Sequence, residues 1–174
     1  MRPEPDVRGE LSIHLTKPPF MGHSVTGFIA SSETAALALV AEPRLRGFSL
    51  EQAAVLFPLS NDLIDEIFPP SRDRGPAEFT YLSPPVMEFL LALSVHGPIA
   101  YFETEYHGGT GDQVAVVFRG GQVAYGPRRG EIGPINEALR LLGIERLTQS
   151  DEFQAVGLWR HRFTEEWLEL DAGK

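Results

Sequence analysis

Ionisable side chains converge in one short stretch of the sequence, AYFETEYH. An extended strand here places on one face Tyr101, Glu103, Glu105 and His107. Carboxylate and imidazole groups at alternate positions are side chains that can bind a metal ion. Two neighbouring carboxylates also interact electrostatically, as the acid–base pair of a hydrolase does. Neighbouring positions on one face of a strand are about 6–7 Å apart, so a metal would need a ligand from elsewhere. Two interpretations stay open, a functional site or a solvated sheet face with Arg119 nearby.

The strand is followed by a glycine-rich segment, His107 to Asp112, which resembles a phosphate-binding loop in composition only. Phosphate-binding loops lead from a strand into a helix, whereas this segment leads from one strand to the next and lacks a following Gly-Lys-Ser/Thr. We therefore interpret it as a hairpin turn, with Asp112 as a charged contact residue. A Gly-x-Ser-x-Gly nucleophile motif is absent from the chain.

A basic cluster near the C-terminus combines Arg160, His161 and Arg162 with the flanking aromatic residues Trp159 and Phe163. In a functional interpretation these cations contact an anion or the strand carboxylates across the fold. In the alternative, the segment is exposed and its tryptophans pack onto the body of the protein. We retain Arg160 and His161 as candidate binding residues.

The candidate strand belongs to a three-stranded meander at about residues 98–126. A first turn centred on Gly109-Thr110-Gly111 would give the cross-strand pairs Phe102–Phe118, Thr104–Val116 and Tyr106–Val114. Gly120-Gly121 forms the second turn, because two glycines supply the positive φ angles of a tight hairpin. That turn would pair Phe118 with Val123 and Val116 with Tyr125.

The rest of the chain alternates short strands and helices. Strands are predicted at 11–17 and 23–30, and helices at 33–42, 61–68 (capped by Ser60), 86–96, 135–142, from Asp151 and from Thr164. The segment 49–57 is ambiguous, since Ser49 and Gln52 form a capping box while Ala54 to Phe57 is typical of a buried strand.

Five stretches carry a resemblance to a known group of proteins. In chain order they are GHSVTGFIA, VLFPLSNDLIDEI, AYFETEYHGGTGDQ, GPINEALRLLGI and DEFQAVGLWRHRFTEEWL. Together they resemble a group of small bacterial proteins of uncharacterised function, from which no activity, cofactor or catalytic residue is carried over. The resemblance associates the chain with toxin-immunity proteins, which are small acidic inhibitors of a cognate toxin. It also favours a strand over a capping-box helix at VLFPLS.

Composition limits the class of protein. With 174 residues, of which 43% are hydrophobic, the chain is expected to form one α+β domain at 10–174 behind a flexible leader at 1–9. A net charge of −9 disfavours nucleic acid as a partner and favours a basic protein. Without cysteine there are no disulfides or thiolate metal sites. Neither a signal sequence nor an apolar run of roughly 18 residues is seen, so we expect a cytoplasmic protein without a membrane span.

The expected fold is α+β, an antiparallel sheet that includes the meander, with helices packed on its apolar face. The expected core contains Phe28, Leu37, Leu56, Ile64, Phe89, Leu90, Leu93, Phe102, Tyr106, Val116, Phe118, Val123, Ile135 and Leu139.

The leading functional hypothesis is a non-catalytic binding or inhibitor module that engages a basic, toxin-like protein. Its charge contacts would be Glu103, Glu105 and Asp112, and its aromatic anchor Tyr101. The alternative is a metal- or carboxylate-dependent enzyme built on the strand face that carries Glu103, Glu105 and His107. We assign no cofactor, no metal ligand and no catalytic residue, and leave open whether the chain forms a homo-oligomer.

Overall fold

The protein is built around a six-stranded antiparallel sheet with strand order β2-β3-β1-β4-β5-β6. Its structure is a computed structural model that describes residues 22–170. The strands are β1 (Thr26–Ser31), β2 (Phe48–Ser49), β3 (Ala54–Pro58), β4 (Ile99–His107), β5 (Thr110–Arg119) and β6 (Gln122–Gly130). The helices are α1 (Ser32–Ala41), α2 (Asn61–Ile67), α3 (Pro84–Leu93), α4 (Pro134–Leu141), α5 (Glu152–Val156) and α6 (Thr164–Glu169), with a short 3₁₀ helix, η1 (Leu158–Arg160), before α6.

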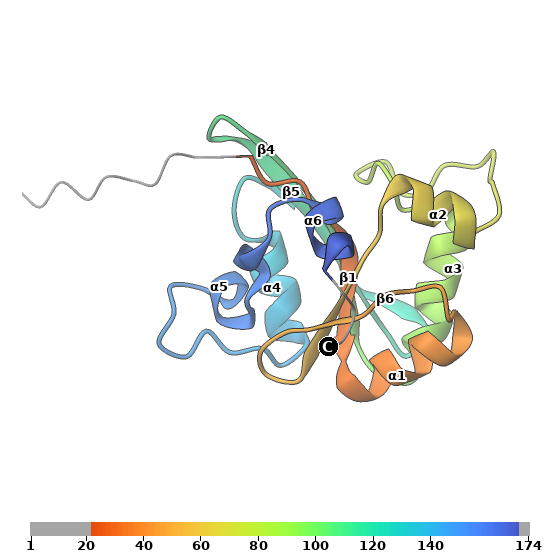
Figure 1. The fold of residues 1–174 in the computed structure, drawn as a ribbon, viewed down its shortest axis with the longest axis horizontal. Coiled ribbons are helices and arrows are strands. Elements are labelled where there is room, and N and C mark those ends of the chain that lie inside the picture. The colour runs from red at the N-terminus through yellow and green to blue at the C-terminus, as the bar shows by residue number, and fades with distance from the viewer. Residues whose placement is uncertain (1–21, 171–174) are drawn as a thin grey trace, which may run out of the picture.

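Two hydrophobic cores lie on opposite faces of the sheet. Tyr101 and Leu90 belong to the core under α1, α2 and α3, and Phe102 and Leu139 belong to the core under α4, α5 and α6 (Figure 1). The predicted α+β fold, with an antiparallel meander and packed helices, is confirmed. From the sequence we expected the sheet to have one apolar face, but both of its faces are apolar. In β4, for example, the four consecutive residues Ile99–Phe102 are nonpolar or aromatic and alternate between the two cores.

Local signals determine where the helices begin. The side chains of Ser31, Ser60 and Asp151 each accept a hydrogen bond from a backbone N–H of the first turn, at 3.2, 3.2 and 2.8 Å, and Ser60 is the cap that the sequence predicts above. Prolines occupy the first positions of α3 and α4, where the missing N–H has no helical partner to lose. The helices therefore lie within a few residues of the predicted ranges.

The predicted register of the first hairpin is wrong. The turn consists of Gly108 and Gly109, both with positive φ (58° and 87°), rather than being centred on Gly109-Thr110-Gly111. Phe118 consequently pairs with Ile99 instead of Phe102. A shift by an odd number of residues exchanges the two faces of a strand, so Phe118 packs with Tyr101 and not with Phe102.

The second hairpin turn, Gly120-Gly121, is confirmed, as is the pairing of Phe118 with Val123. Beyond it the ladder contains irregularities, and Tyr125 pairs with Val117 instead of Val116. Gly126 makes this irregularity feasible: a Cβ at this position would lie 2.5 Å from the carbonyl oxygen of Ala115.

The structure also decides between helix and strand at 49–57 and tests the predicted core. Segment 49–57 contains the strand β3 and not a capping-box helix, because Gln52 and Ala53 have positive φ and form a turn. Of the predicted core, Leu37 and Val123 are exposed and Tyr106, Ile64 and Phe89 are half-buried, while the remaining nine residues are buried. The leader at 1–9 and the strand at 11–17 lie outside the described residues.

Candidate functional site: a pocket beside His23

Two of the predicted strand-face residues are buried. Tyr101 is completely buried, so it is unavailable as an aromatic anchor at the surface. The Glu103 carboxylate, also buried, accepts hydrogen bonds from the backbone N–H groups of Thr80 and Tyr81, both at 2.8 Å, and from the Tyr101 hydroxyl at 2.9 Å. Burial and the neighbouring carboxylate raise the pKa of Tyr101 well above its ordinary value, so the phenol remains a donor. Glu103 thus holds the loop before α3 against the sheet.

The other three residues of the hairpin remain near solvent. Glu105 and His107 are exposed at the end of β4, with His107 Nε2 3.4 Å from a Glu105 carboxylate oxygen. Asp112 is half-buried and forms an ion pair of 2.8 Å with Arg129. Within residues 22–170, no three His, Asp or Glu side chains are grouped so that they could hold a metal ion. Glu103, Glu105 and His107 share a strand face, as predicted, but do not converge on a common point.

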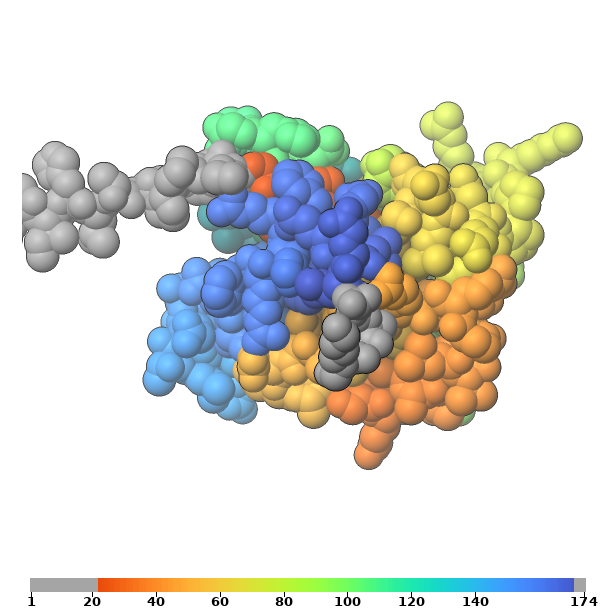
Figure 2. Space-filling model, in the orientation of Figure 1, coloured from red at the N-terminus to blue at the C-terminus, as the bar shows by residue number. Residues whose placement is uncertain are grey.

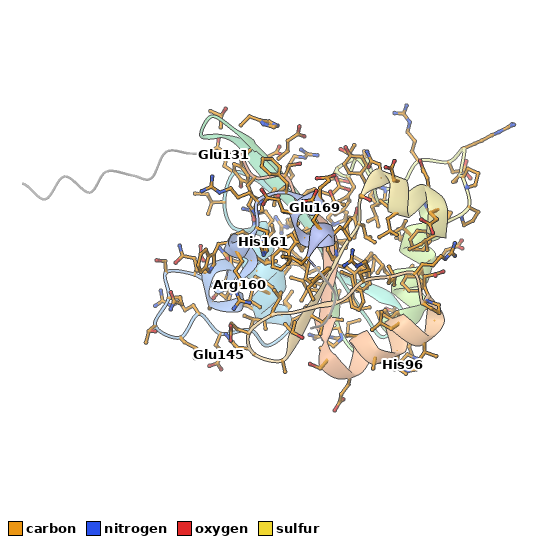
Figure 3. The ribbon with its side chains drawn as sticks, in the orientation of Figure 1. His96, Glu131, Glu145, Arg160, His161 and Glu169 are labelled. Atoms are coloured by element: carbon orange, nitrogen blue, oxygen red, sulfur yellow. The ribbon has the colours of Figure 1, made fainter. Side chains whose placement is uncertain are left out.

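The predicted basic cluster lies on the other layer of the molecule. Arg160 contacts Glu51, and the His161 ring packs edge-on against Trp167 with their centroids 4.6 Å apart. Figure 3 shows Arg160 and His161 beside α5 and α6. Trp167 is buried as the packing interpretation expects, whereas Trp159 remains 60% exposed. The folded chain therefore does not bring this cluster to Glu103 or Glu105.

A pocket of about 310 Å³ opens on the same layer, at the N-terminal ends of α4 and α5. This volume is at the lower end of the range for small-ligand sites. The pocket is lined by His23, Thr104, Tyr106, Gln113, Glu131, Ile132, Ile135, Asn136, Asp151 and Phe153. It therefore uses the face of β4 opposite to the predicted one, which carries Glu103 and Glu105.

Hydrogen bonds between β4, β5 and α4 build one wall of the pocket. The Gln113 side chain donates to the Tyr106 hydroxyl at 2.9 Å and accepts from the backbone N–H of Ile135 at 2.8 Å. Tyr106 in turn donates to the backbone carbonyl of Glu131. The loop between β6 and α4 is thus tied to the sheet, and it contributes Glu131 and Ile132 to the pocket lining. Figure 3 labels Glu131.

The opposite wall is held by side chains that cap α5. One carboxylate oxygen of Asp151 accepts from the backbone N–H of Gln154 at 2.8 Å. The amide oxygen of Asn136 accepts from the backbone N–H of Phe153 at 2.9 Å, which fixes α5 against α4. The second carboxylate oxygen of Asp151 is 3.5 Å from the Asn136 amide nitrogen, so it retains capacity to accept from a ligand.

His23 is the most perturbed ionisable group of the pocket. Burial lowers its pKa to about 4, against the opposing effect of the Leu158 backbone, and the nearby Arg162 lowers it further. Its Nδ1 atom shares a 2.7 Å hydrogen bond with the Thr104 hydroxyl, and its ring meets Phe153 edge-on with centroids 5.4 Å apart. At neutral pH the imidazole is therefore uncharged, and the acidic residues of the pocket lining are Glu131 and Asp151.

Most pocket residues were not identified from the sequence. Thr104 and Tyr106 belong to the predicted strand, but His23, Gln113, Asn136 and Asp151 carry no motif of their own. The one feature of the sequence that could have pointed to these residues is the set of five stretches quoted for the resemblance. Four of those stretches contain residues that line the pocket.

Comparisons with known proteins give no further assignment. No family model matches the chain, and neither the curated proteins nor the solved structures compared with it include a similar one. Among the described helices, none combines the length and apolar character needed to span a bilayer. Function is therefore inferred from the geometry of the pocket.

Proposed function

We propose that the protein is a non-catalytic binding module for a basic protein, and that the pocket beside His23 receives a lysine or arginine side chain of that partner. The observation that carries this proposal is the composition of the lining. It combines two acidic residues, Glu131 and Asp151, with the aromatic residues Tyr106 and Phe153, and it contains no lysine or arginine. Such surroundings stabilise a cation through charge and through the negative faces of the aromatic rings.

The protonation states of the pocket support the same ligand class. Because the pKa of His23 is lowered to about 4, the imidazole does not repel a cation at neutral pH. Burial raises the pKa of Tyr106, which keeps its hydroxyl neutral. Within the lining itself, the acidic residues are then Glu131 and Asp151, while Arg162 lies outside the lining and close enough to act on His23.

A protein partner, rather than a free small cation, is favoured by the rim. Ile132 lines the pocket and is 83% exposed, so it offers an apolar contact beside the charged recess. The net charge of −9 steers a basic protein toward this surface and accelerates its association. With a toxin-like partner, the effect would be inhibition by occlusion, as the association with immunity proteins suggests.

The alternative enzyme on the face of β4 receives no comparable support. Three protein donors already occupy the Glu103 carboxylate, while Glu105 and His107 extend into solvent. The candidate charge contact at Asp112 is engaged by Arg129. Of the residues first predicted to meet a partner, Glu105 remains an exposed carboxylate in the hairpin, and it would serve as a peripheral contact.

The pocket can be tested without knowing the partner, by NMR titration with Nα-acetyl-arginine amide, its lysine counterpart and its citrulline counterpart. Citrulline has nearly the shape of arginine but no charge. We expect the two cations to shift the amide resonances of Gln113, Asn136 and Phe153, and citrulline to leave them unchanged. Equal shifts with citrulline, or no shift at the pocket with either cation, would contradict the proposal.

Matched variants isolate the charges. Asp151→Asn combined with Glu131→Gln should weaken cation binding about tenfold or more, at roughly 1.4 kcal/mol per factor of ten. Asn also caps helices well, so α5 should be retained. The control is Asp62→Asn with Glu66→Gln on α2, which makes the same change in net charge away from the pocket. At low salt, the pocket variant should capture less of a basic protein from the host lysate than the α2 control does. That difference would extend the result to the partner.

A further inference from the structure

Helix α1 is apolar on both of its sides although only one side is buried. Thr34, Ala35 and Ala38 face the core, while the solvent side presents Leu37, Leu39 and Val40 with exposed fractions of 42%, 39% and 79%. Residues 36–41 contain no polar side chain. A surface helix normally carries polar residues on its outer side, and helices that are apolar all round are normally enclosed. The described residues leave this side of α1 uncovered.

A groove of about 270 Å³ runs beside this exposed side, between α1 and α3. Its lining is Leu37, Val40, Ala41, Phe89, Ala92, Leu93 and His96. Figure 3 places His96 next to α1, and Figure 2 shows α1, in orange, on the outside of the molecule. The surface thus combines protruding aliphatic side chains with a recess of matching chemistry.

We propose that this α1–α3 face is a self-association surface through which two copies of the chain form a symmetric dimer. A twofold interface needs a patch that is complementary to itself, and protruding residues beside an apolar groove meet that need. Val40, which lines the groove and is 79% exposed, would pack against the groove lining of the other copy. The proposal is independent of the pocket beside His23, which lies on the opposite layer.

Charge distinguishes a second copy from other occupants. The chain carries a net charge of −9, so two copies repel each other across most orientations. The α1–α3 face is the exception, because Glu33 is the only charged residue in α1 and Glu88 the only one in α3. A basic partner would find no carboxylate in the groove lining, whereas two like-charged copies meet there with the least repulsion.

Sedimentation velocity of the full chain over a wide range of concentrations tests the proposal. We expect a monomer–dimer equilibrium in the wild type. Val40→Glu should raise the dissociation constant roughly a hundredfold, because a twofold interface would bury the new carboxylate twice. The matched control is Leu147→Glu at another exposed aliphatic residue, 67% exposed in the loop after α4, which should leave the dimer intact.

Salt and cross-linking provide independent readouts. Added salt screens the repulsion between copies, so the dimer should strengthen or stay constant, whereas cation binding in the pocket should weaken. The chain lacks cysteine, so Val40→Cys introduces a single thiol, which a bis-maleimide should link into a covalent dimer faster than it links Leu147→Cys. A monomeric wild type, a Val40→Glu dimer of unchanged affinity, or equal cross-linking of the two cysteines would overturn the proposal.

Discussion

At the scale of single residues, buried polar groups carry the most specific information in this protein. Glu103 and His23 lie on opposite faces of the same sheet and both make long-range hydrogen bonds, Glu103 buried and His23 half-buried. Glu103 secures the loop that precedes α3, and His23 forms part of the pocket. Removing a buried hydrogen-bonding partner leaves the remaining groups unpaired, so each residue should have a measurable effect on stability.

Replacing Glu103 by alanine should destabilise the fold by about 3 kcal/mol, because two backbone N–H groups and the Tyr101 hydroxyl lose their acceptor. The measurement is the free energy of unfolding from urea denaturation. Glu105→Ala, on the same strand face but exposed, should cost less than about 0.5 kcal/mol. Similar effects of the two substitutions would show that the Glu103 network contributes nothing specific.

His23 should make stability depend on pH. Its pKa is about 4 in the folded chain, against 6.5 for an unperturbed histidine, so between these values the unfolded chain binds more protons. Its contribution is complete above about pH 6.5 and is lost as the pH falls toward 4, a loss of about 3 kcal/mol at roughly 1.4 kcal/mol per pKa unit.

The test compares unfolding free energies at pH 7 and pH 4 for the wild type and for His23→Gln. The variant has no titrating group at this position, so the part of the pH dependence that His23 supplies should disappear. An unchanged pH dependence in the variant would contradict a lowered histidine pKa.

At the scale of elements, capping residues and glycines determine where helices and hairpins begin and end. Ser60 caps α2 through its side chain, whereas Ser83, at the equivalent position of α3, makes no capping hydrogen bond through its side chain. Pro84 and Pro85 occupy the first turn of α3 and lack backbone N–H groups, so fewer N–H groups there need a cap than in α2.

Ser60→Ala should therefore destabilise the protein by about 1 kcal/mol, the usual cost of losing a side-chain cap. Ser83→Ala should change the unfolding free energy by only a few tenths of a kcal/mol. Thermal or urea denaturation of the two variants provides the comparison. A larger loss for Ser83→Ala than for Ser60→Ala would reverse the assignment of the caps.

At the scale of the whole molecule, one sheet separates two cores that share few side chains. Ile99 packs with the α1–α3 layer and Ile135 with the α4–α6 layer. The two faces also differ in what they offer to other molecules. The α4–α6 layer carries the acidic pocket, and the α1–α3 layer carries the nearly uncharged apolar groove.

Substitutions in the two cores should be additive. Ile99→Val and Ile135→Val should each cost about 1 kcal/mol, and the double variant should lose the sum to within about 0.5 kcal/mol. Urea denaturation with a two-state fit measures all three values. A coupling energy above about 1 kcal/mol would mean that strain passes through the sheet between the layers.

Local signals in the sequence predicted the elements of this protein well. Caps such as Ser60, prolines such as Pro84, and the Gly120-Gly121 turn act within a few residues, so their effect does not depend on the rest of the fold. The first hairpin shows the limit of such local signals. Two candidate turns overlap in one glycine-rich segment, and only the packing of both faces selects Gly108-Gly109.

The sequence alone determined the α+β class, the meander and the ends of most helices, since these follow from periodicity and capping. The tertiary structure alone decided which side chains converge. His23 and Thr104 are 81 positions apart, and their 2.7 Å hydrogen bond depends on the order of the strands. Glu131 and Asp151 line one pocket because α4 and α5 dock on the same face of the sheet. Convergence of this kind is a property of long-range packing, which no short stretch of sequence encodes.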